Sequence, residues 1–219
     1  MSYILNLETA TKNCSVSLAK NGETILCKEI AEQGYSHAEK LHVFINDVVN
    51  EIGISMSDLA AIAVSQGPGS YTGLRIGVSA AKGLCYALEI PLIAIDTLTS
   101  LAYKVIFTDG LIVPMIDARR MEVYSAIFNF NKEMIREVQA EILTEESFAG
   151  VTETIYFIGD SNEKAKSVLN QPNFVFIDDV VYPSAHEMSS ISFDKFQKKD
   201  FVDVAYFEPY YLKDFMLTK

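Results

Sequence analysis

Paired cysteines, basic residues and long uninterrupted hydrophobic runs are all scarce in this sequence. The most apolar stretch, residues 71–95, is broken by Arg75, Lys82, Glu89 and Pro91. A membrane-spanning helix needs about 20 predominantly apolar residues in a row, so no span is predicted. The first ten residues lack the basic segment that opens a secretory signal, and no signal peptide is predicted either.

Cysteine usage favours a reducing compartment. The three cysteines, Cys14, Cys27 and Cys85, are odd in number, and none belongs to a C-x-x-C pair. Disulfide scaffolds and zinc knuckles need even or closely spaced cysteines. Neither class is therefore predicted, and we expect a cytoplasmic protein.

Basic residues are outnumbered throughout the chain. There are 18 Lys and Arg against 29 Asp and Glu, which gives a formal net charge of −11. The only concentrated basic spots are Arg119-Arg120 and Lys198-Lys199. A protein that binds RNA alone usually neutralises the phosphates with clustered Lys and Arg. If this chain acts on nucleic acid, another subunit must supply most of the binding.

The sequence does contain a pattern of strands that occurs twice. With 219 residues, 49% of them hydrophobic, the chain can form one large domain or two small ones. Residues 3–8, 14–20 and 23–30 are predicted strands, and Asn21-Gly22 favours a type I′ hairpin because both central residues of that turn need positive φ. Residues 111–117, 122–129 and 133–141 repeat this order, with a turn at Asn131-Lys132.

Each three-strand unit is followed by alternating helix and strand patterns. The first half predicts a helix over 36–52, a strand over 60–66, a helix over 71–88, a strand over 91–96 and a helix over 97–106. The second half predicts a helix near Glu145, a strand over 154–159, a helix from Ser161 and a strand over 174–177. This duplicated βββαβα plan predicts an α/β fold and resembles the two-lobed actin-like ATPase (ASKHA) fold. We expect an N-terminal lobe over residues 1–105 and a C-terminal lobe over 106–219.

A glycine-rich segment, QGPGSYTGLR, links a predicted strand to a predicted helix at residues 66–75. Such loops can present backbone N–H groups to phosphate. No Lys-Ser or Lys-Thr follows, so the segment is not a P-loop, and Gly67, Gly69 and Gly73 do not fit G-x-G-x-x-G. Two readings stay open: a tight turn with Ser70 capping the next helix, or a phosphate-binding loop.

The helices predicted over 36–52 and 71–88 carry apolar stripes wider than contact with one sheet requires. One interpretation is a thick core. The other is a partner surface, in which Gly73 and Gly77, four residues apart on one face, let another backbone approach closely. The residues predicted for that partner surface are Leu41, Phe44, Ile45 and Val48 on the first helix and Tyr71, Gly73, Leu74, Gly77, Val78 and Ala81 on the second.

Few residues favour metal binding or catalysis. His37 and His42 are five positions apart, so on a helix they point in different directions and do not form the H-E-x-x-H zinc motif.

Two predicted strands end on an acid, and in the actin-like fold two hairpin turns face each other across a nucleotide cleft. The cleft candidates by that resemblance are Glu8, Thr9, Asp117 and Arg119. The alternative for Asp117 is that it accepts hydrogen bonds from its own turn.

Four segments and the tail carry a family resemblance. The segments are ILNLETATKNCSVSL, SHAEKL, SQGPGSYTGLRIGVSAAKGL and IDARRMEVYSAIF. The tail EPYYLK at 208–213 is similar to a closing P-x-Y-L-R, with Lys213 for Arg. Together they resemble the TsaB family, the accessory subunit of bacterial tRNA threonylcarbamoyladenosine (t6A) synthesis.

The resemblance implies a scaffold rather than an enzyme. TsaD, the catalytic paralogue, carries the metal-ligand pair H-x-x-x-H where this chain has Thr97 and Leu101. Leucine cannot bind a metal, so we expect no metal site, no catalytic residue and no required cofactor. The sequence leaves open whether the cleft holds a nucleotide. The isolated chain is expected to lack ATPase, peptidase and tRNA-modifying activity.

The partners implied by the resemblance are a TsaD-like catalytic subunit and a TsaE-like ATPase. Contact with tRNA would be indirect, through the complex, and the chain alone would form a homodimer. The alternative function is an actin-like kinase or ATPase, although the chain is short for one and neither Glu8 nor Asp117 opens a D-x-G-x-T hairpin. A metallopeptidase is nearly excluded by the missing ligand pair.

Overall fold

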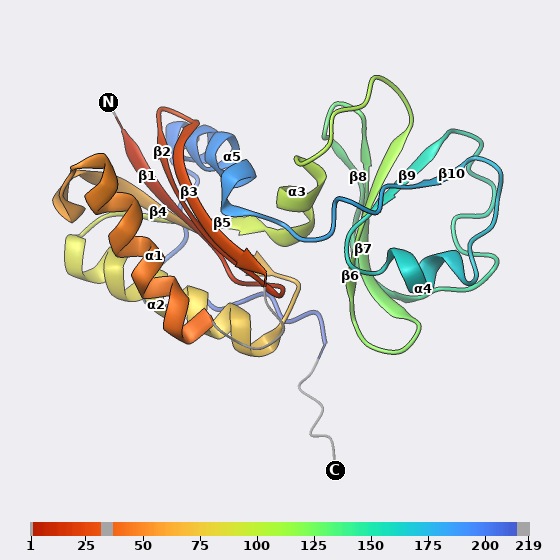
Figure 1. Ribbon diagram of the computed structural model, residues 1–219, viewed down its shortest axis with the longest axis horizontal. Coiled ribbons are helices and arrows are strands. Elements are labelled where there is room, and N and C mark those ends of the chain that lie inside the picture. The colour runs from red at the N-terminus through yellow and green to blue at the C-terminus, as the bar shows by residue number, and fades with distance from the viewer. Residues whose placement is uncertain (1, 32–36, 214–219) are drawn as a thin grey trace, which may run out of the picture.

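Two five-stranded mixed sheets organise the chain (Figure 1). The computed structural model describes residues 2–31 and 37–213. The first sheet, in the order β3-β2-β1-β4-β5, contains β1 (Tyr3–Glu8), β2 (Asn13–Lys20), β3 (Glu23–Ala31), β4 (Leu59–Gly67) and β5 (Leu92–Asp96). The second, in the order β10-β9-β6-β7-β8, contains β6 (Leu111–Asp117), β7 (Glu122–Asn129), β8 (Met134–Ile142), β9 (Ile155–Ile158) and β10 (Phe174–Phe176). The second order, read from β8 to β10, repeats the first, because β6 to β10 take the places of β1 to β5. This repetition confirms the predicted two-lobed α/β fold.

Turn chemistry fixes the first hairpin. Asn21 has φ 51° and Gly22 has φ 89°, as a type I′ turn requires. β1 pairs antiparallel with β2, whereas β1–β4 and β4–β5 are parallel pairs. Parallel neighbours need long crossover connections. Helices α1 (His37–Ile52) and α2 (Tyr71–Leu88) provide them.

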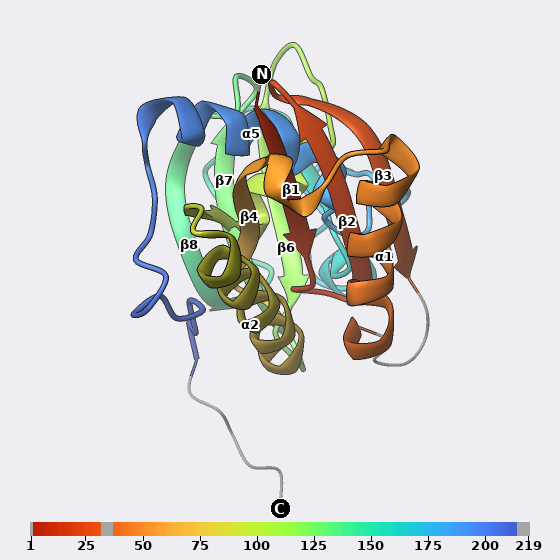
Figure 2. The same cartoon turned by 90° about the vertical axis from the view of Figure 1, so that its left-hand side faces the viewer.

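Successive side chains of a strand point to opposite faces of the sheet, and both faces of the first sheet are covered. Leu5 and Leu7 belong to a core shared with α1 and α2. Ile4 and Ala61 belong to a second core shared with α5 (Ala185–Lys198). Figures 1 and 2 show α1 and α2 together on one face and α5 on the other. A short 3-10 helix, η1 (Met56–Asp58), leads into β4.

The second sheet is covered in the same way. Ile112 packs in a core with α3 (Thr97–Ala102), and Val113 packs in the opposite core with α4 (Asn162–Lys166) and the segment after it. α3 follows the first sheet yet packs on the second, while α5 follows the second sheet and packs on the first. The two lobes thus exchange one helix each. Among the described residues no helix is long and apolar enough to cross a lipid bilayer.

Two predicted helices need correction. The helix expected near Glu145 is absent, because residues 145–150 form turns in which Phe148 has φ 62° and Gly150 has φ 86°. Positive φ cannot belong to a right-handed helix. The helix expected over 97–106 ends at Ala102, where the amide of Lys104 already bonds to the carbonyl of Leu101. α5 was not predicted at all.

The expected C-terminal lobe, residues 106–219, does not account for the segment after Pro183. α5 lies on the first sheet, and so do Val202 and Phe207 in the segment after it. Val202 forms an antiparallel bridge with Leu92 at the edge of β5, and Phe207 packs against the core under α1 and α2. The exchange of helices between lobes is the physical reason, because a linear division of the chain cannot represent it.

Candidate functional site

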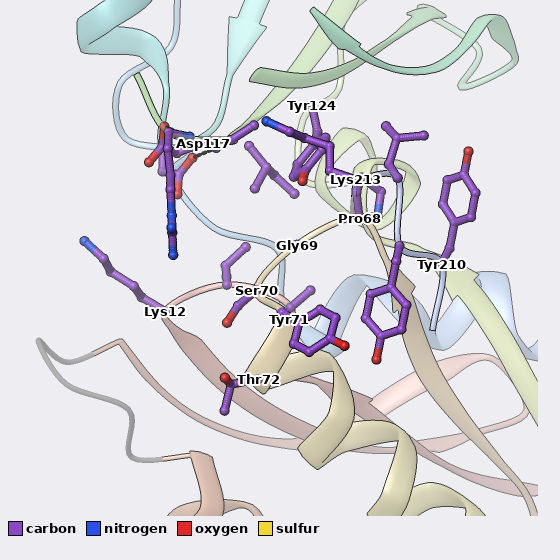
Figure 3. A pocket seen from close by; sticks show the side chains of 18 of the residues that line it. Lys12, Pro68, Gly69, Ser70, Tyr71, Thr72, Asp117, Tyr124, Tyr210 and Lys213 are labelled. Atoms are coloured by element: carbon purple, nitrogen blue, oxygen red, sulfur yellow. Dashed lines mark hydrogen bonds between the residues drawn. The ribbon is translucent and has the colours of Figure 1, made fainter. Parts of the chain in front are cut away.

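A cavity of about 390 Å³ opens between the two lobes (Figure 3). The first lobe contributes the β1–β2 turn with Lys12 and the loop into α2 with Ser70. The second lobe contributes the end of β6 with Asp117, and β7 with Tyr124. The C-terminal residues 210–213 complete the wall. Its volume lies in the range of small-molecule sites, roughly 300–1,000 Å³.

The glycine-rich loop is held in place by the β1–β2 turn. The amide of Ser70 donates to the carbonyl of Ala10 at 2.6 Å. A Cβ on Gly69 would lie 2.3 Å from that same carbonyl oxygen, so only glycine permits this approach. The Ser70 hydroxyl accepts from the amide of Gly73 at 3.2 Å and caps α2. The predicted tight turn with a Ser70 cap is confirmed, and the N-terminus of α2 borders the cavity.

The facing turn of the second lobe joins β6 to β7 through two consecutive arginines with positive φ, 71° at Arg119 and 52° at Arg120. Asp117 accepts from the amide of Arg119 at 3.1 Å and forms an ion pair with Lys164. Its own amide donates to Asp160 at 2.8 Å, and burial raises the pKa of Asp160. Asp117 therefore accepts a hydrogen bond from its own turn and also lines the cavity.

Two of the four cleft residues predicted from the sequence lie outside the cavity. Glu8 and Thr9 are fully buried beneath the turn. A Glu8 oxygen accepts from the amide of Ala10 at 2.6 Å and from the hydroxyl of Ser65 at 2.8 Å. Burial, and then the charge of Asp96, raises the pKa of Glu8 to about 7. Glu8 and Thr9 thus shape the turn, whereas Asp117 and Arg119 line the cavity as expected.

α3 carries the two positions that the family resemblance matches to the paralogue's metal ligands. Thr97 and Leu101 lie one turn apart, and both are fully buried. Leu101 packs among apolar side chains such as Ile112 and Phe128. It has no ligand atom, so these two positions do not fit a metal ion. Within residues 2–31 and 37–213, no three His, Cys, Asp or Glu side chains are grouped as metal ligands.

The histidines occupy separate environments. His37 is the first residue of α1, and its Nε2 lies 2.8 Å from the carbonyl oxygen of Thr11. Burial lowers the pKa of His37. His42 is exposed on the same helix.

The predicted partner surface is mostly interior, which corrects the sequence prediction. Its apolar members Leu41, Ile45, Val48, Leu74, Val78 and Ala81 are buried in this chain's own core. Gly73 and Gly77 make room for Thr9. A Cβ on Gly73 would lie 2.1 Å from the Thr9 carbonyl oxygen, and a Cβ on Gly77 would lie 2.2 Å from the Thr9 hydroxyl. Only Phe44 and Tyr71 of the predicted set are partly exposed.

The chain is 30% identical over 220 residues to the tRNA threonylcarbamoyladenosine biosynthesis protein TsaB of Escherichia coli, covering 96% of this chain and 94% of that protein. The chain belongs to the TsaB family. The TsaB of Bacillus subtilis is 33% identical over 62% of this chain and 58% of its own length, less than two thirds of it.

Other matches place this TsaB-family chain among its wider relatives. The family model described as TsaD, tRNA N6-adenosine threonylcarbamoyltransferase, matches residues 24–206. The curated enzyme of that name from B. subtilis is 30% identical over 52% of this chain but only 37% of its own length. The solved structure of YeaZ from Pseudomonas aeruginosa aligns over 97% of this chain and 100% of that one, at 28% identity and a TM-score of 0.82.

A more distant structure supports the fold alone. Component A of the (R)-2-hydroxyglutaryl-CoA dehydratase of Acidaminococcus fermentans aligns over 89% of this chain with a TM-score of 0.51 at 9% identity.

Sequence reasoning on this TsaB-family chain missed part of the cavity. Lys12, Tyr124 and the tail residues Tyr210 and Tyr211 line it, and Figure 3 shows Lys12 on one side of the space and Tyr210 on another. The tail motif was recognised in the sequence, but nothing in it indicated that the tail returns to the junction of the lobes. The sequence offers one local indication that Lys12 belongs to the cavity, because Lys12 lies in the turn that follows Glu8.

Proposed function

We propose that this chain is a non-catalytic accessory subunit in the formation of t6A in tRNA. The proposal is supported by the match to the E. coli TsaB protein over 96% of the chain. The observation that carries the non-catalytic part is Leu101, which is fully buried on α3 where the catalytic paralogue has a metal ligand. A leucine at that position cannot be converted into a ligand by any rotamer change.

The accessory role requires a surface for a TsaD-like catalytic subunit. α2 keeps a line of partly exposed apolar residues, Ile76, Ala80 and Leu84, spaced four residues apart so that they share one face. On α1, Val43 is 49% exposed beside the partly buried Phe44. Adjacent exposed apolar residues are typical of interaction sites. We therefore assign the partner contact to these outer edges of α1 and α2 in place of the buried residues first predicted.

The same edges would allow a second copy of the chain to bind when the catalytic subunit is absent, giving a homodimer. A TsaE-like ATPase would join the assembled pair. With a net charge of −11 the chain repels polyphosphate, so tRNA would contact it only within the complex. A mobility-shift titration near physiological salt should give no submicromolar binding by the chain alone.

The experiment that tests the partner surface is co-purification with the TsaD homologue of the same organism. Ala80→Asp places a charge on the apolar line and should reduce the recovered complex strongly. Ser79→Asp adds the same charge at the neighbouring exposed position and should leave recovery unchanged. Thermal melting of both variants checks that they fold. Equal recovery of the two variants would place the interface elsewhere.

One observation favours the alternative of a nucleotide-dependent activity. The cavity lies between the β1–β2 and β6–β7 turns and is bordered by Lys12, Arg119 and the N-terminus of α2, all of which favour an anion. We rank this second because Leu101 and the full-length match point to a subunit. Calorimetric titration with ATP, together with ATP turnover by the purified chain, separates the two functions.

A further inference from the structure

The chain after α5 follows the first lobe along an extended path. Val202 bridges to Leu92 at the sheet edge. Further on, Lys82 of α2 donates to the carbonyls of Ala205 and Phe207, at 3.1 and 2.8 Å. These contacts fasten the segment from several sides, since they involve both the sheet and a helix.

The next residues are fastened near the cavity. The amide of Tyr210 donates to the carbonyl of Gln66 at 2.7 Å. Gly67 makes room for this, because a Cβ there would lie 2.6 Å from the carbonyl oxygen of Tyr210. Arg75 stacks on the ring of Tyr71 at 4.0 Å and donates from Nε to the hydroxyl of Tyr211 at 3.2 Å. The two tyrosine rings lie 4.6 Å apart.

The last described residue reaches the other lobe. Lys213 forms an ion pair with Glu122 at the start of β7, and both side chains are partly buried. Residues 210–213 line the cavity on the way. The tail is therefore attached to the first lobe by backbone bonds, stacking and apolar packing, and to the second lobe by an ion pair of a class that is individually weak.

The two covalent links between the lobes lie elsewhere. They are the junction between β5 and α3, at Asp96 and Thr97, and residues 177–184, before α5. Figure 1 shows both crossing near the middle of the molecule, whereas the tail runs below them. A tether placed away from the covalent links is well positioned to limit rotation of one lobe against the other.

We propose that residues 201–213 are a releasable strap that holds the two lobes together beside the inter-lobe cavity. The first-lobe end is permanent, and the Lys213–Glu122 pair is the latch. Release of the latch frees Lys213 from the second lobe and lets the lobes separate, while Tyr210 and Tyr211 stay attached to the first lobe. The strap acts on the conformation of the chain by itself, so it does not depend on the accessory function proposed above.

A charge-swap series tests the latch. Spin labels are attached to Glu39→Cys and Glu163→Cys, which are exposed on α1 and α4, in a chain carrying Cys27→Ser. Double electron–electron resonance then gives the distribution of inter-lobe distances. Lys213→Glu and Glu122→Lys should each lengthen and broaden this distribution. The double variant, with the pair reversed, should restore it.

Matched controls keep the result interpretable. Lys199→Glu makes the same charge change at the exposed residue that follows α5 and should leave the distances unchanged. A chain ending at Glu208 should give the long, broad distribution, whereas one ending at Lys213 should not. Thermal melting confirms that each variant is folded. Unchanged distances in Lys213→Glu, or failure of the double variant to restore them, would overturn the proposal.

Discussion

Gly77 and Gly83 lie on the same helix and experience opposite surroundings. A Cβ on Gly77 would lie 2.2 Å from the Thr9 hydroxyl, whereas nothing lies within 4 Å of one on Gly83. We expect Gly77→Ala to lower the free energy of unfolding by about 1–3 kcal/mol through overpacking. Gly83→Ala should raise it by about 0.5–1 kcal/mol through helix propensity. Urea denaturation measures both, and equal effects would mean that the Thr9 contact is unimportant.

Glu8 makes stability depend on pH in a predictable direction. Its pKa is about 7 in the folded chain against 4.5 for an ordinary glutamate, so its favourable contribution is complete below about pH 4.5 and is lost as the pH rises through 7. The glutamine of the Glu8→Gln variant cannot titrate. Over this pH range the free energy of unfolding of the variant should therefore rise relative to that of the unsubstituted chain, by on the order of 3 kcal/mol.

The measurement for Glu8 is the difference in unfolding free energy between the two chains from about pH 4.5 to about pH 8. Burial also raises the pKa of Asp96, to about 6, but Asp96 is present in both chains and largely cancels in the difference. A difference that stays flat with pH would contradict the account of Glu8 as a carboxyl that is protonated near neutral pH.

At the scale of elements, α5 is held by polar as well as apolar contacts. Ser184 caps its N-terminus by accepting from the amide of His186 at 3.1 Å and donates to Glu29 at 2.6 Å. We expect Ser184→Ala to lower the free energy of unfolding by about 1–2 kcal/mol. Ser190→Ala, at an exposed position of the same helix, should have little effect. Similar melting curves for the two variants would contradict this role for the cap.

Elements with strong local signals were predictable from the sequence. Residues 3–8, 71–88 and 111–117 form the predicted elements with the predicted bounds, because apolar runs and turn residues agree there. α5 was missed since half of its buried positions are serines, Ser189 and Ser192 beside Ala185 and Met188, which gives no apolar period. The positive φ angles of the β6–β7 turn were not predictable from the sequence, because arginines and not glycines occupy both of these positions.

At the scale of the whole molecule, duplication and exchange of helices decide where the site lies. The sequence predicted that two turns face each other, and Asp117 and Arg119 do line the cavity. It did not predict the burial of Glu8, nor the return of the tail through Tyr210. Those facts depend on contacts between residues far apart in the chain, for which local patterns carry no information.

The central claim is that this chain is required for t6A formation without catalysing it. The direct measurement is the amount of t6A that forms in initially unmodified tRNA during incubation with the TsaD and TsaE homologues of the same organism and their substrates. Mass spectrometry of tRNA digests gives this amount. The account predicts modification with all three proteins, only background without this chain, and none with this chain alone. Modification by this chain alone, or undiminished modification in its absence, would contradict it.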